Sequence, residues 1–379
     1  MKVLQFVKTS DGAIWAYNQT WELIRLGVDI ITVLPKKDGH VAELYYETNL
    51  PVYIMDASLS IVSFVTFFRK IKGLRQLVRK IQPDLIHCHF VTNILMLRLS
   101  LIGICVPRFF QVPGPLHLES PLSKYADILT AGNYDYYGAS CRKTEYIYNK
   151  SRRLRDRVFL TYYGGNFHSN IESDGRLHQE YCISNHAKIV GMVAYFYRPK
   201  RYLLKFRGIK GHEDFICAVA QLRKIDSSII GFIIGGAWVG AEKYEERVRY
   251  FAQDACPNGI VFTGIRKDIA NIYSELDVVV HPSLSENLGG AVESLAAGVP
   301  TVATNVGGFP DVIIHGETGL LVAPKNPTAI TKSVLHILND YDGAKKMAQK
   351  GKAYVSKFNV QATAAAVKQV YETIIKMRN

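Results

Sequence analysis

The sequence has few of the features that mark secreted, zinc-bound or membrane-spanning proteins. Its 379 residues include only six cysteines, none in a Cys-x-x-Cys pair, so neither a disulfide framework nor a structural zinc site is expected. No apolar run approaches the roughly 20 residues that span a bilayer, and the richest run, residues 94–106, is interrupted by Arg98. Met1–Val7 predicts a first strand rather than a signal peptide. We therefore expect a cytoplasmic protein, either soluble or peripheral on the inner face of the membrane.

Acidic residues are also scarce relative to basic ones. The chain has 33 Asp and Glu against 46 Lys and Arg, which gives a formal net charge of +13. This excess favours polyanionic partners such as nucleic acids, anionic lipid headgroups or phosphorylated substrates. No recognisable DNA- or RNA-binding module accompanies the charge, so nucleic acid is not expected as the partner. The hydrophobic content of 48% is high enough for two or three domains with their own cores.

Short apolar runs alternate with helical stretches along both halves of the chain. This alternation predicts α/β domains with parallel, doubly wound sheets. Predicted strands of the first half are 3–7, 29–34, 51–55, 85–90 and 109–112, with Ile128–Thr130 or Tyr136–Ala139 as a further one. Predicted strands of the second half are 189–193, 229–234, 260–262, 277–280, 301–304 and 320–322. Two final helices are predicted at 327–339 and 360–377.

A polar segment without a clear period, near residues 166–185, predicts a linker between two domains. We place the N-terminal domain at residues 1–168, the linker at 169–186 and the C-terminal domain at 187–358. The last segment, residues 359–379, predicts a helix that crosses back to the N-terminal domain.

The stretch 277–304 combines a strand, a polar loop, a glycine-rich helix start and a second strand. Ligands bind at the carboxyl ends of the strands in such βαβ units. Gly289 and Gly290 would let a ligand approach the main chain, and free N–H groups at a helix start attract phosphate. Glu286 and Glu293 lie two helical turns apart, and their carboxylates can accept from the hydroxyls of a sugar or ribose. The pattern suits a sugar nucleotide, with a plain crossover bearing two solvated glutamates as the alternative.

A set of motifs resembles the GT-B glycosyltransferases of the retaining family 4. The motifs are PSLSE at 282–286, ESLAAGVPTVAT at 293–304, GGFPD at 307–311, GETGLLV at 316–322, VFTG at 261–264 and DLIHCH at 84–89. The resemblance covers nearly the whole chain and is most specific in its C-terminal half. It implies two Rossmann-like doubly wound domains facing across a cleft. The N-terminal domain would bind the acceptor and the C-terminal domain the nucleotide sugar.

The chain departs from the family pattern at two places. Glu286 and Glu293 differ by seven positions where the family has eight, so either the loop is shorter or Ser285 holds the place of the first glutamate. We favour the shorter loop, because PSxxE is intact. The strand end where the family carries an arginine is altered here to Val193-Ala194-Tyr195 and is followed by an insertion at 197–207. Three residues could supply the missing charge, namely Arg198, Lys205 and Arg207.

The resemblance assigns donor-binding roles in the C-terminal domain. Lys210 matches the lysine that stabilises the leaving diphosphate. Glu293 matches the acid that accepts from the ribose hydroxyls, and Glu286 the acid beside the donor sugar. Arg266 lies where the family places the edge of the nucleobase. Phosphate or sugar oxygens are expected on the main chain at the helix start, at Asn287, Leu288, Gly289 and Gly290. A solvated lysine or glutamate is the rival explanation for the charged side chains.

In the N-terminal domain the resemblance singles out Gly12 and His117. Gly12 lies in the loop that the family holds near the donor phosphates, with a simple turn glycine as the alternative. His117 matches a histidine close to the reacting sugar, with a buried structural histidine as the alternative. His87 and His89 are expected to line the cleft or cap their strand, because no third metal ligand is evident. No DxD motif flanks the donor site, so neither a metal ion nor another cofactor is required.

The combined expectation is a hexosyltransferase that uses a nucleotide sugar, with UDP favoured, and a glycan or lipid-linked acceptor. The resemblance implies retention at the anomeric carbon and a role in surface polysaccharide or glycolipid synthesis. His117, Lys210 and Glu286 are the expected catalytic residues. A GT-B-like nucleotide-sugar epimerase or phosphorylase is the alternative, although no lysine signature for pyridoxal phosphate stands out.

A basic, aromatic-rich segment at Ile61–Ile81 predicts an amphipathic helix. Its six Lys and Arg accompany Phe64, Phe67 and Phe68, a composition typical of helices that lie on an anionic membrane surface. A core-packed helix with a solvated cationic face is the alternative and the commoner case. A second basic cluster lies at residues 150–155. A lipid-linked, anionic acceptor would suit both segments.

Overall fold

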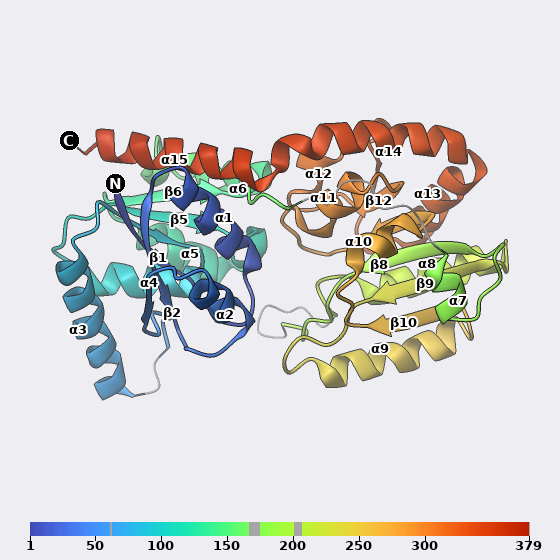
Figure 1. Ribbon diagram of the computed structural model, residues 1–379, viewed down its shortest axis with the longest axis horizontal. Coiled ribbons are helices and arrows are strands. Elements are labelled where there is room, and N and C mark those ends of the chain that lie inside the picture. The colour runs from blue at the N-terminus through green and yellow to red at the C-terminus, as the bar shows by residue number, and fades with distance from the viewer. Residues whose placement is uncertain (61–62, 167–174, 201–206, 379) are drawn as a thin grey trace. The chain divides into compact units, whose positions relative to one another are not determined.

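The computed structural model describes residues 1–60, 63–166, 175–200 and 207–378. The chain forms two compact units, unit 1 with residues 1–166 and 358–379, and unit 2 with residues 167–357. Each unit is built on one parallel sheet flanked by helices (Figure 1). This confirms the predicted fold class of two doubly wound α/β sheets. None of the described helices combines the length and apolar composition that a membrane span requires.

Unit 1 contains a seven-stranded sheet in the order β3-β2-β1-β4-β5-β6-β7, with every strand pair parallel. Its strands are β1 (Lys2–Phe6), β2 (Asp29–Leu34), β3 (Val52–Ile54), β4 (Leu85–Cys88), β5 (Arg108–Val112), β6 (Asp135–Ala139) and β7 (Val158–Leu160). Its α-helices are α1 (Ile14–Arg25), α2 (His40–Glu47), α3 (Phe64–Ile81), α4 (Val91–Ser100), α5 (Pro121–Leu129), α6 (Arg142–Asn149) and α15 (Val360–Lys376). The strand order reverses between β1 and β4.

The two faces of the unit 1 sheet carry different helices. One face is packed by α3, α4 and α6, which bury residues such as Leu74 and Ile94 in one core. The other face is covered by α1, α2 and α15. The last helix supplies apolar residues at helical spacing, and Val367 and Tyr371 are fully buried beside Val3. Figure 1 shows α15 lying along α1, with which it is in contact.

One of the two alternatives for a further strand is wrong. Ile128–Thr130 forms the end and the C-cap of α5, whereas Tyr136–Ala139 lies in β6. The helix begins with Pro121, a position where the fixed φ of proline favours helix. Within α5 only Asp127 and Ile128 are buried. The apolar residue Ile128 therefore lies on the buried side of a helix and not in an alternating strand.

Unit 2 contains a six-stranded sheet in the order β10-β9-β8-β11-β12-β13, again with every pair parallel. Its strands are β8 (Lys188–Val193), β9 (Ile229–Ile234), β10 (Ile260–Gly264), β11 (Val278–His281), β12 (Thr301–Thr304) and β13 (Leu320–Val322). Its α-helices are α7 (Arg176–Glu180), α8 (His212–Arg223), α9 (Glu242–Ala255), α10 (Ile269–Ser274), α11 (Gly289–Ala296), α12 (Phe309–Val312), α13 (Pro327–Asn339) and α14 (Tyr341–Val355).

The predicted linker at 169–186 falls partly outside the described residues, because these begin again at residue 175. Its second part forms α7, whose Leu177 is buried in the unit 2 core beside Ile189 and Phe232. The backbone N–H of Leu177 donates to the carboxylate of Glu275 at 2.8 Å. Residues 176–180 therefore pack as part of unit 2.

The carboxyl ends of the unit 2 strands meet at one edge of the sheet, because all the strands run in the same direction. The strand order reverses between β8 and β11, which are neighbours in the sheet, with Val278 paired to Val190. The chain leaves β8 toward α8 and leaves β11 toward α11. Such a switch point is where open α/β sheets bind ligands, and the loops at this edge carry the predicted donor-binding residues.

Candidate functional site

Two glycines hold the loop between β11 and α11 in place. Gly211 has φ +75°, and a Cβ added there would stand 2.1 Å from the carbonyl oxygen of Pro282. Gly307 has φ +55°, and a Cβ added there would stand 1.7 Å from the carbonyl oxygen of Glu286. Only glycine accommodates both the positive φ and the close approach. The loop is thereby fixed between the start of α8 and the segment after β12, which sets the position of Glu286.

An ion pair joins Lys210 to Glu286 across this loop. The Lys210 ammonium donates to the Oε2 atom of Glu286. The two side chains are 19% and 13% exposed, so water screens the pair only in part. The carboxylate also accepts from the Ser283 hydroxyl at 3.3 Å and from the Asn287 backbone N–H at 3.1 Å. These contacts hold Glu286 toward Lys210.

The environment of Lys210 keeps its ammonium charged. Burial alone would lower the pKa of Lys210, but the charge and hydrogen bond of Glu286 outweigh burial and raise that pKa above its ordinary value. The Tyr197 ring lies 5.9 Å from the ammonium and adds a weaker attraction. A permanent cation at the switch point can bind an anionic ligand that replaces Glu286 as its partner.

Glu293 lies on α11 and accepts from the Tyr273 hydroxyl at 3.4 Å. The surrounding protein desolvates this carboxylate and raises its pKa, while the Tyr273 hydrogen bond and the charge of Lys210 oppose the shift. The residue as a whole is exposed, so water reaches the carboxylate and the shift stays smaller than full burial would give. Tyr273 was not predicted, because its role depends on a contact 20 residues away that no local motif records.

A cavity of about 280 Å³ lies at this edge of the sheet. Its charged lining residues are Lys210, Arg266 and Glu293. The other lining residues are small, apolar or aromatic, namely Val193, Ala194, Tyr195, Tyr197, Ile234, Gly235, Ile265, Ile269 and Gly290. A narrow second pocket shares Lys210 and Gly290 with this cavity and reaches Glu286. The structure therefore brings these five predicted residues together, beside an apolar surface from β8, β9 and the segment that follows β10.

The other residues predicted at the start of α11, namely Asn287, Leu288 and Gly289, differ in what they contribute to this site. Leu288 is buried at 3% exposure, so its side chain belongs to the core. Gly289 has φ +47°, and a Cβ added there would stand 2.8 Å from the Glu286 carboxyl carbon. Within the described residues, the buried side-chain oxygen of Asn287 has no hydrogen-bond partner. It is a further acceptor beside Glu286.

Arg266 lines the cavity, but neighbouring carboxylates compensate its positive charge. Its guanidinium donates to Asp268 at 2.7 and 2.9 Å and also to Glu180. These hydrogen bonds, first those to Asp268, raise the pKa of Arg266 above its ordinary value. Because two carboxylates already compensate its charge, Arg266 adds little net positive potential for a diphosphate. Its assignment to the edge of a nucleobase stays a prediction.

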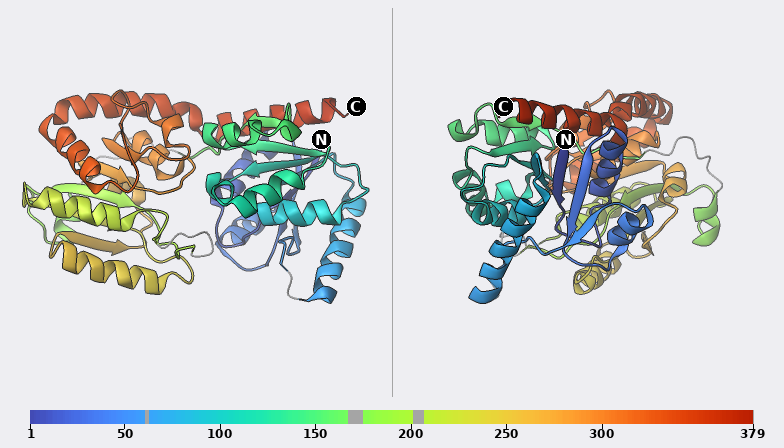
Figure 2. Two further views of the ribbon diagram at one scale, coloured as in Figure 1. Left: turned by 180° about the vertical axis from the view of Figure 1, so that it is seen from behind. Right: turned by 60° about the vertical axis from the view of Figure 1, so that its left-hand side comes forward.

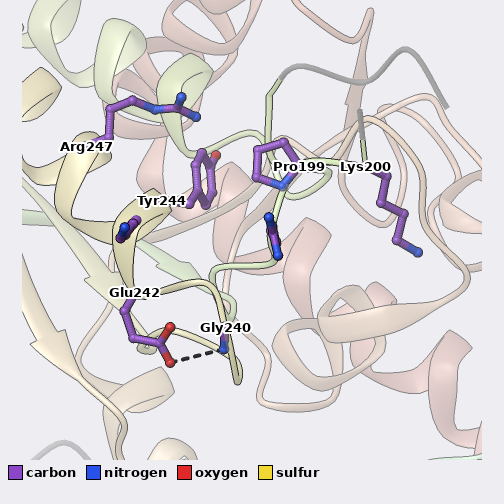
Figure 3. Close-up of a pocket in the computed structure, with 8 residues that line it drawn as sticks. Pro199, Lys200, Gly240, Glu242, Tyr244 and Arg247 are labelled. Carbon is purple, nitrogen blue, oxygen red and sulfur yellow. Dashed lines mark hydrogen bonds between the residues drawn. The ribbon is translucent and has the colours of Figure 1, made fainter. Parts of the chain in front are cut away.

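Of the three candidates for the missing arginine, the two that the structure describes, Arg198 and Arg207, do not line this cavity. Arg207 is paired with Asp214 at 3.1 Å, and Lys205 lies outside the described residues. Arg198 lines a separate, larger pocket of about 830 Å³ (Figure 3). That pocket is basic, and its lining residues are Arg198, Pro199, Lys200, Gly240, Glu242, Lys243, Tyr244 and Arg247. Among its described lining residues the one acid is Glu242, which accepts from the Gly240 N–H at 3.1 Å (Figure 3).

In unit 1, His117 is held by a buried acid. It lies on a short 3-10 helix, Pro115–Glu119, and its Nε2 atom is 3.2 Å from Asp127 Oδ2 and 3.0 Å from the Tyr148 hydroxyl oxygen. Although burial alone would raise the pKa of Asp127, the His117 hydrogen bond and the nearby Arg98 lower it below its ordinary value. Asp127 is therefore a carboxylate, which favours the tautomer with the proton on Nε2. This leaves Nδ1 as the acceptor atom of a neutral His117.

Gly12 lies in the loop after β1, and its N–H donates to the Thr9 hydroxyl at 3.3 Å. This contact is compatible with either a turn glycine or a ligand-binding loop. The role of Gly12 and His117 toward a ligand of unit 2 stays a prediction.

The expectation that His87 and His89 line a cleft or cap their strand is wrong. Both side chains are fully buried, because β4 is a central strand whose two faces are covered. His89 contacts Gln5 at 2.7 Å, and His87 contacts the Tyr371 hydroxyl at 2.6 Å. Burial lowers the pKa of His87 to about 3, so its ring stays neutral. Among the described residues, no three His, Cys, Asp or Glu side chains are grouped to hold a metal ion.

Comparisons of the sequence with protein families agree with these motifs. Residues 202–354 match the model described as glycosyl transferases group 1, and residues 11–151 match a glycosyl transferase 4-like model. The chain is 29% identical over 216 residues to D-inositol 3-phosphate glycosyltransferase of Corynebacterium glutamicum, which covers 55% of this chain and 49% of that protein. The chain therefore matches about half the length of this curated relative.

Comparisons of the structure give the same fold over nearly the whole chain. The crystal structure of Anabaena Alr3699/HepE in complex with UDP-glucose has a TM-score of 0.82 and 18% identity, covering 98% of this chain and 100% of that one. Sucrose-phosphate synthase from Thermosynechococcus elongatus has a TM-score of 0.79 and 19% identity, covering 100% of each chain. At such identities the likeness establishes the fold, which is GT-B.

Proposed function

Because this chain belongs to the GT-B glycosyltransferases of family 4, the group 1 glycosyl transferases, we propose that it moves a hexosyl group from a nucleotide sugar to a glycan or lipid-linked acceptor. The single observation that carries this proposal is the meeting of Lys210, Glu286 and Glu293 at two adjoining pockets of unit 2, which share Lys210. A permanent cation, two acids and an apolar wall are the groups that a nucleoside diphosphate sugar requires. We favour UDP as the nucleotide, supported by UDP-glucose in the similar Anabaena protein.

Each part of the donor has a candidate partner in the cavity. The diphosphate would bind Lys210, together with the backbone N–H groups that open α11. The ribose hydroxyls would donate to the Glu293 carboxylate. The nucleobase would lie against the apolar surface near Ile265 and Ile269, with its edge toward Arg266. Glu286, released from Lys210, would accept from the hydroxyls of the transferred sugar.

The proposed reaction is transfer with retention at the anomeric carbon. The bond between the anomeric carbon and the phosphate oxygen breaks, and negative charge grows on the departing diphosphate. Lys210 stabilises that charge without a metal ion. In the front-side mechanism usual for this family, the acceptor oxygen bonds to the anomeric carbon from the side of the leaving group. The departing phosphate takes the acceptor proton, and His117 keeps the role near the reacting sugar that the resemblance assigns to it.

The acceptor belongs to surface polysaccharide or glycolipid synthesis in this proposal. Its support is the resemblance in the motifs and the excess of positive charge, which suits an acceptor that carries phosphate.

A panel of radiolabelled nucleotide sugars tests the proposal without knowledge of the acceptor. Each sugar nucleotide is incubated with the chain, and slow hydrolysis is followed by release of labelled sugar, with and without EDTA. We expect a UDP-hexose to be hydrolysed in both conditions, and Lys210→Ala to abolish the reaction. Hydrolysis of none of the nucleotide sugars would contradict the proposed function, and a loss of activity in EDTA would contradict its independence from metal.

A further inference from the structure

The helix α3 (Phe64–Ile81) is packed at one end and unsupported at the other. Its second half buries Leu74, Leu77, Val78 and Ile81 in the unit 1 core. Its first half packs on this core only in part, through Phe67 and Ile71, and Phe64, Val65 and Phe68 are 78%, 67% and 62% exposed. Figures 1 and 2 show the N-terminal end of α3 extending away from the rest of unit 1. The helix therefore presents an apolar tip to its surroundings.

This tip is an ordered feature of the helix. Ser63 caps it by accepting from the Thr66 N–H at 3.2 Å, and the Thr66 hydroxyl accepts in return from the Ser63 N–H at 3.2 Å. Such a reciprocal capping box stabilises the first turn. Phe64 and Phe68 are large aromatic side chains, and their transfer from water into an apolar environment is favourable. Their exposure therefore costs free energy that binding to an apolar partner would recover. A contiguous exposed apolar group of this kind marks an interaction site.

The charge of α3 indicates what the tip contacts. The helix carries six Lys and Arg and no acidic residue. Lys70 donates to Asp56 at 2.6 Å, and Arg75 donates to the carbonyls of Ser100 and Ile102, each at 2.9 Å, so these two cations anchor the helix to unit 1. The other four cations, Arg69, Lys72, Arg79 and Lys80, are exposed. This part of the surface is complementary to an anionic partner.

The apolar and basic residues share one side of α3. At about 100° per residue, Phe64, Phe68, Lys72 and Arg79 lie within a stripe of about 80°, and Val65 and Arg69 widen it to about 140°. The aromatic residues occupy the free end of this stripe and the cations follow toward the body of unit 1. An aromatic tip that enters the headgroup region, followed by cations at the level of the phosphates, is the arrangement of a helix that binds a membrane surface.

Elements near α3 in the fold carry further exposed apolar residues. α3 contacts α4, and α4 contacts α5. On α5, Leu122, Tyr125 and Leu129 recur at helical spacing and are 83%, 56% and 61% exposed. Ile102, which follows α4, is 69% exposed. Its carbonyl is one of those bound by Arg75, so it lies directly beside α3.

We propose that the surface formed by Phe64, Val65, Phe68, Arg69, Lys72 and Arg79, called here the α3 tip, docks unit 1 on an anionic lipid bilayer. Nucleic acid explains the cations, but no recognisable nucleic-acid-binding module accompanies them, and the exposed Val65 offers no ring on which a base could stack. A bilayer accommodates both groups at once. The docking would bring the chain to a lipid-linked acceptor, a consequence that rests on the proposed function, although the surface itself does not.

Flotation with lipid vesicles tests this proposal. The full chain is mixed with vesicles of phosphatidylcholine alone or of phosphatidylcholine with phosphatidylglycerol, at increasing salt. We expect it to float with the anionic vesicles at low salt and to dissociate as salt shortens the screening length, which is about 10 Å at 0.1 M. Equal binding to neutral vesicles, or no binding to anionic vesicles at low salt, would overturn the proposal.

Matched variants locate the contact on the chain. The triple variant Arg69→Gln, Lys72→Gln and Arg79→Gln should bind anionic vesicles about 100-fold more weakly, since each cation near the surface contributes about tenfold or less. The control changes three exposed lysines of α14 in unit 2, Lys345→Gln, Lys346→Gln and Lys350→Gln, with the same loss of net charge. It should bind as the native chain does. An equal loss in both variants would overturn the assignment to the α3 tip.

The apolar part is tested in the same way. Phe64→Ser with Phe68→Ser should lower vesicle binding about 100-fold, whereas Val239→Ser in unit 2, where Val239 is 84% exposed, should leave it unchanged. Light scattering of the native chain tests whether a second copy of the chain, rather than a bilayer, covers the α3 tip. A dimer that the double serine variant disrupts would overturn the bilayer proposal.

Titration with UDP separates this proposal from the proposed function. All the α3 variants should bind UDP in solution as the native chain does, because the UDP site lies in unit 2, and circular dichroism checks that unit 1 remains folded. A chain that floats but binds no nucleotide contradicts the proposed function alone. A chain that binds UDP but does not float contradicts the docking surface alone.

Discussion

At the scale of single residues, the contact between Lys210 and Glu286 has the most consequences. It pairs a permanent cation with a carboxylate in a partly shielded position, at the edge of a cavity. A diphosphate carries more negative charge than a carboxylate and also reaches the N–H groups of the α11 start. In the absence of ligand, Glu286 therefore serves as the anion that Lys210 binds, and a diphosphate would replace it.

Glu286→Gln is expected to bind UDP about tenfold more tightly than the native chain, because the diphosphate no longer competes with a carboxylate for Lys210. Transfer should nevertheless fall about 100-fold, since Glu286 is assigned to the sugar. Calorimetric titration with UDP and the rate of labelled sugar release measure the two effects. Glu242→Gln, at an exposed acid of α9, is the control and should change neither. Weaker UDP binding by Glu286→Gln would contradict this account.

Glu293→Gln is expected to raise stability and lower donor affinity. The pKa of Glu293 is raised in the folded chain, so the folded state holds this proton more tightly than the unfolded state does. The carboxylate therefore costs stability as pH rises above its ordinary pKa of 4.5. The variant should melt about 1–2 °C above the native chain at pH 8, with the difference vanishing near pH 4.

Calorimetric scans from pH 4 to pH 8 measure this difference. Asp254→Asn, at an exposed acid of α9, should show no such dependence on pH. UDP affinity of Glu293→Gln should fall about tenfold through the weakened ribose contact. A melting temperature below that of the native chain at pH 8 would contradict the raised pKa.

Residues tied to local motifs were predictable, and residues tied to distant contacts were not. Lys210, Glu286 and Glu293 each belong to a short motif, and the βαβ connection brings those motifs to one edge of the sheet. Tyr273 and Asp127 escaped prediction, because each acts through a partner on another element. The pairing of Lys210 with Glu286 also escaped, since the two lie 76 residues apart.

At the scale of elements, the two glycines that hold the loop after β11 connect the fold to the site. Gly307 lets the segment after β12 pass against the main chain of Glu286. The loop is consequently positioned by packing on both sides and not by its own sequence alone.

Gly307→Ala is expected to displace Glu286 and to weaken UDP binding at least tenfold. The added Cβ would stand 1.7 Å from the Glu286 carbonyl oxygen, so the loop must move. The control is Gly316→Ala, which has φ +79° and nothing within 4 Å of an added Cβ. Both variants share a backbone cost of about 1–3 kcal/mol, and only Gly307→Ala should lose additional stability and UDP affinity. Equal effects of the two variants would contradict the role of the close contact.

The sequence was informative about most strands and long helices but not about α14 (Tyr341–Val355). That helix buries small residues, Ala344, Ala348 and Gly351, together with Val355. A packing face made of alanine and glycine gives little hydrophobic periodicity, although the spacing is helical. Gly351 packs closely on Thr318, and a Cβ there would stand 2.7 Å from its carbonyl oxygen. In the sequence, such close packing gives only a weak apolar pattern, so α14 was not predicted.

At the scale of the whole molecule, the candidate residues are divided between the two units. The residues assigned to the nucleotide lie in unit 2, whereas His117 and the α3 tip lie in unit 1. This division predicts that nucleotide binding and transfer respond to different substitutions.

His117→Gln is expected to leave UDP affinity unchanged and to lower transfer about 100-fold. The glutamine keeps a polar side chain beside Asp127, so unit 1 should remain folded, which circular dichroism checks. His178→Gln, on α7 in unit 2, is the matched control and should leave transfer unchanged. A native transfer rate in His117→Gln would contradict a role of His117 in transfer and would show that its contacts are only structural.

The central claim is that a nucleoside diphosphate binds the cavity around Lys210, and a calorimetric titration of UDP into the native chain and Lys210→Ala tests it most directly. The account predicts one site in the native chain and at least a tenfold loss of affinity in the variant, because a charge-assisted contact contributes about 1.5–3 kcal/mol. Absence of UDP binding to the native chain, or equal affinity in the two proteins, would contradict it.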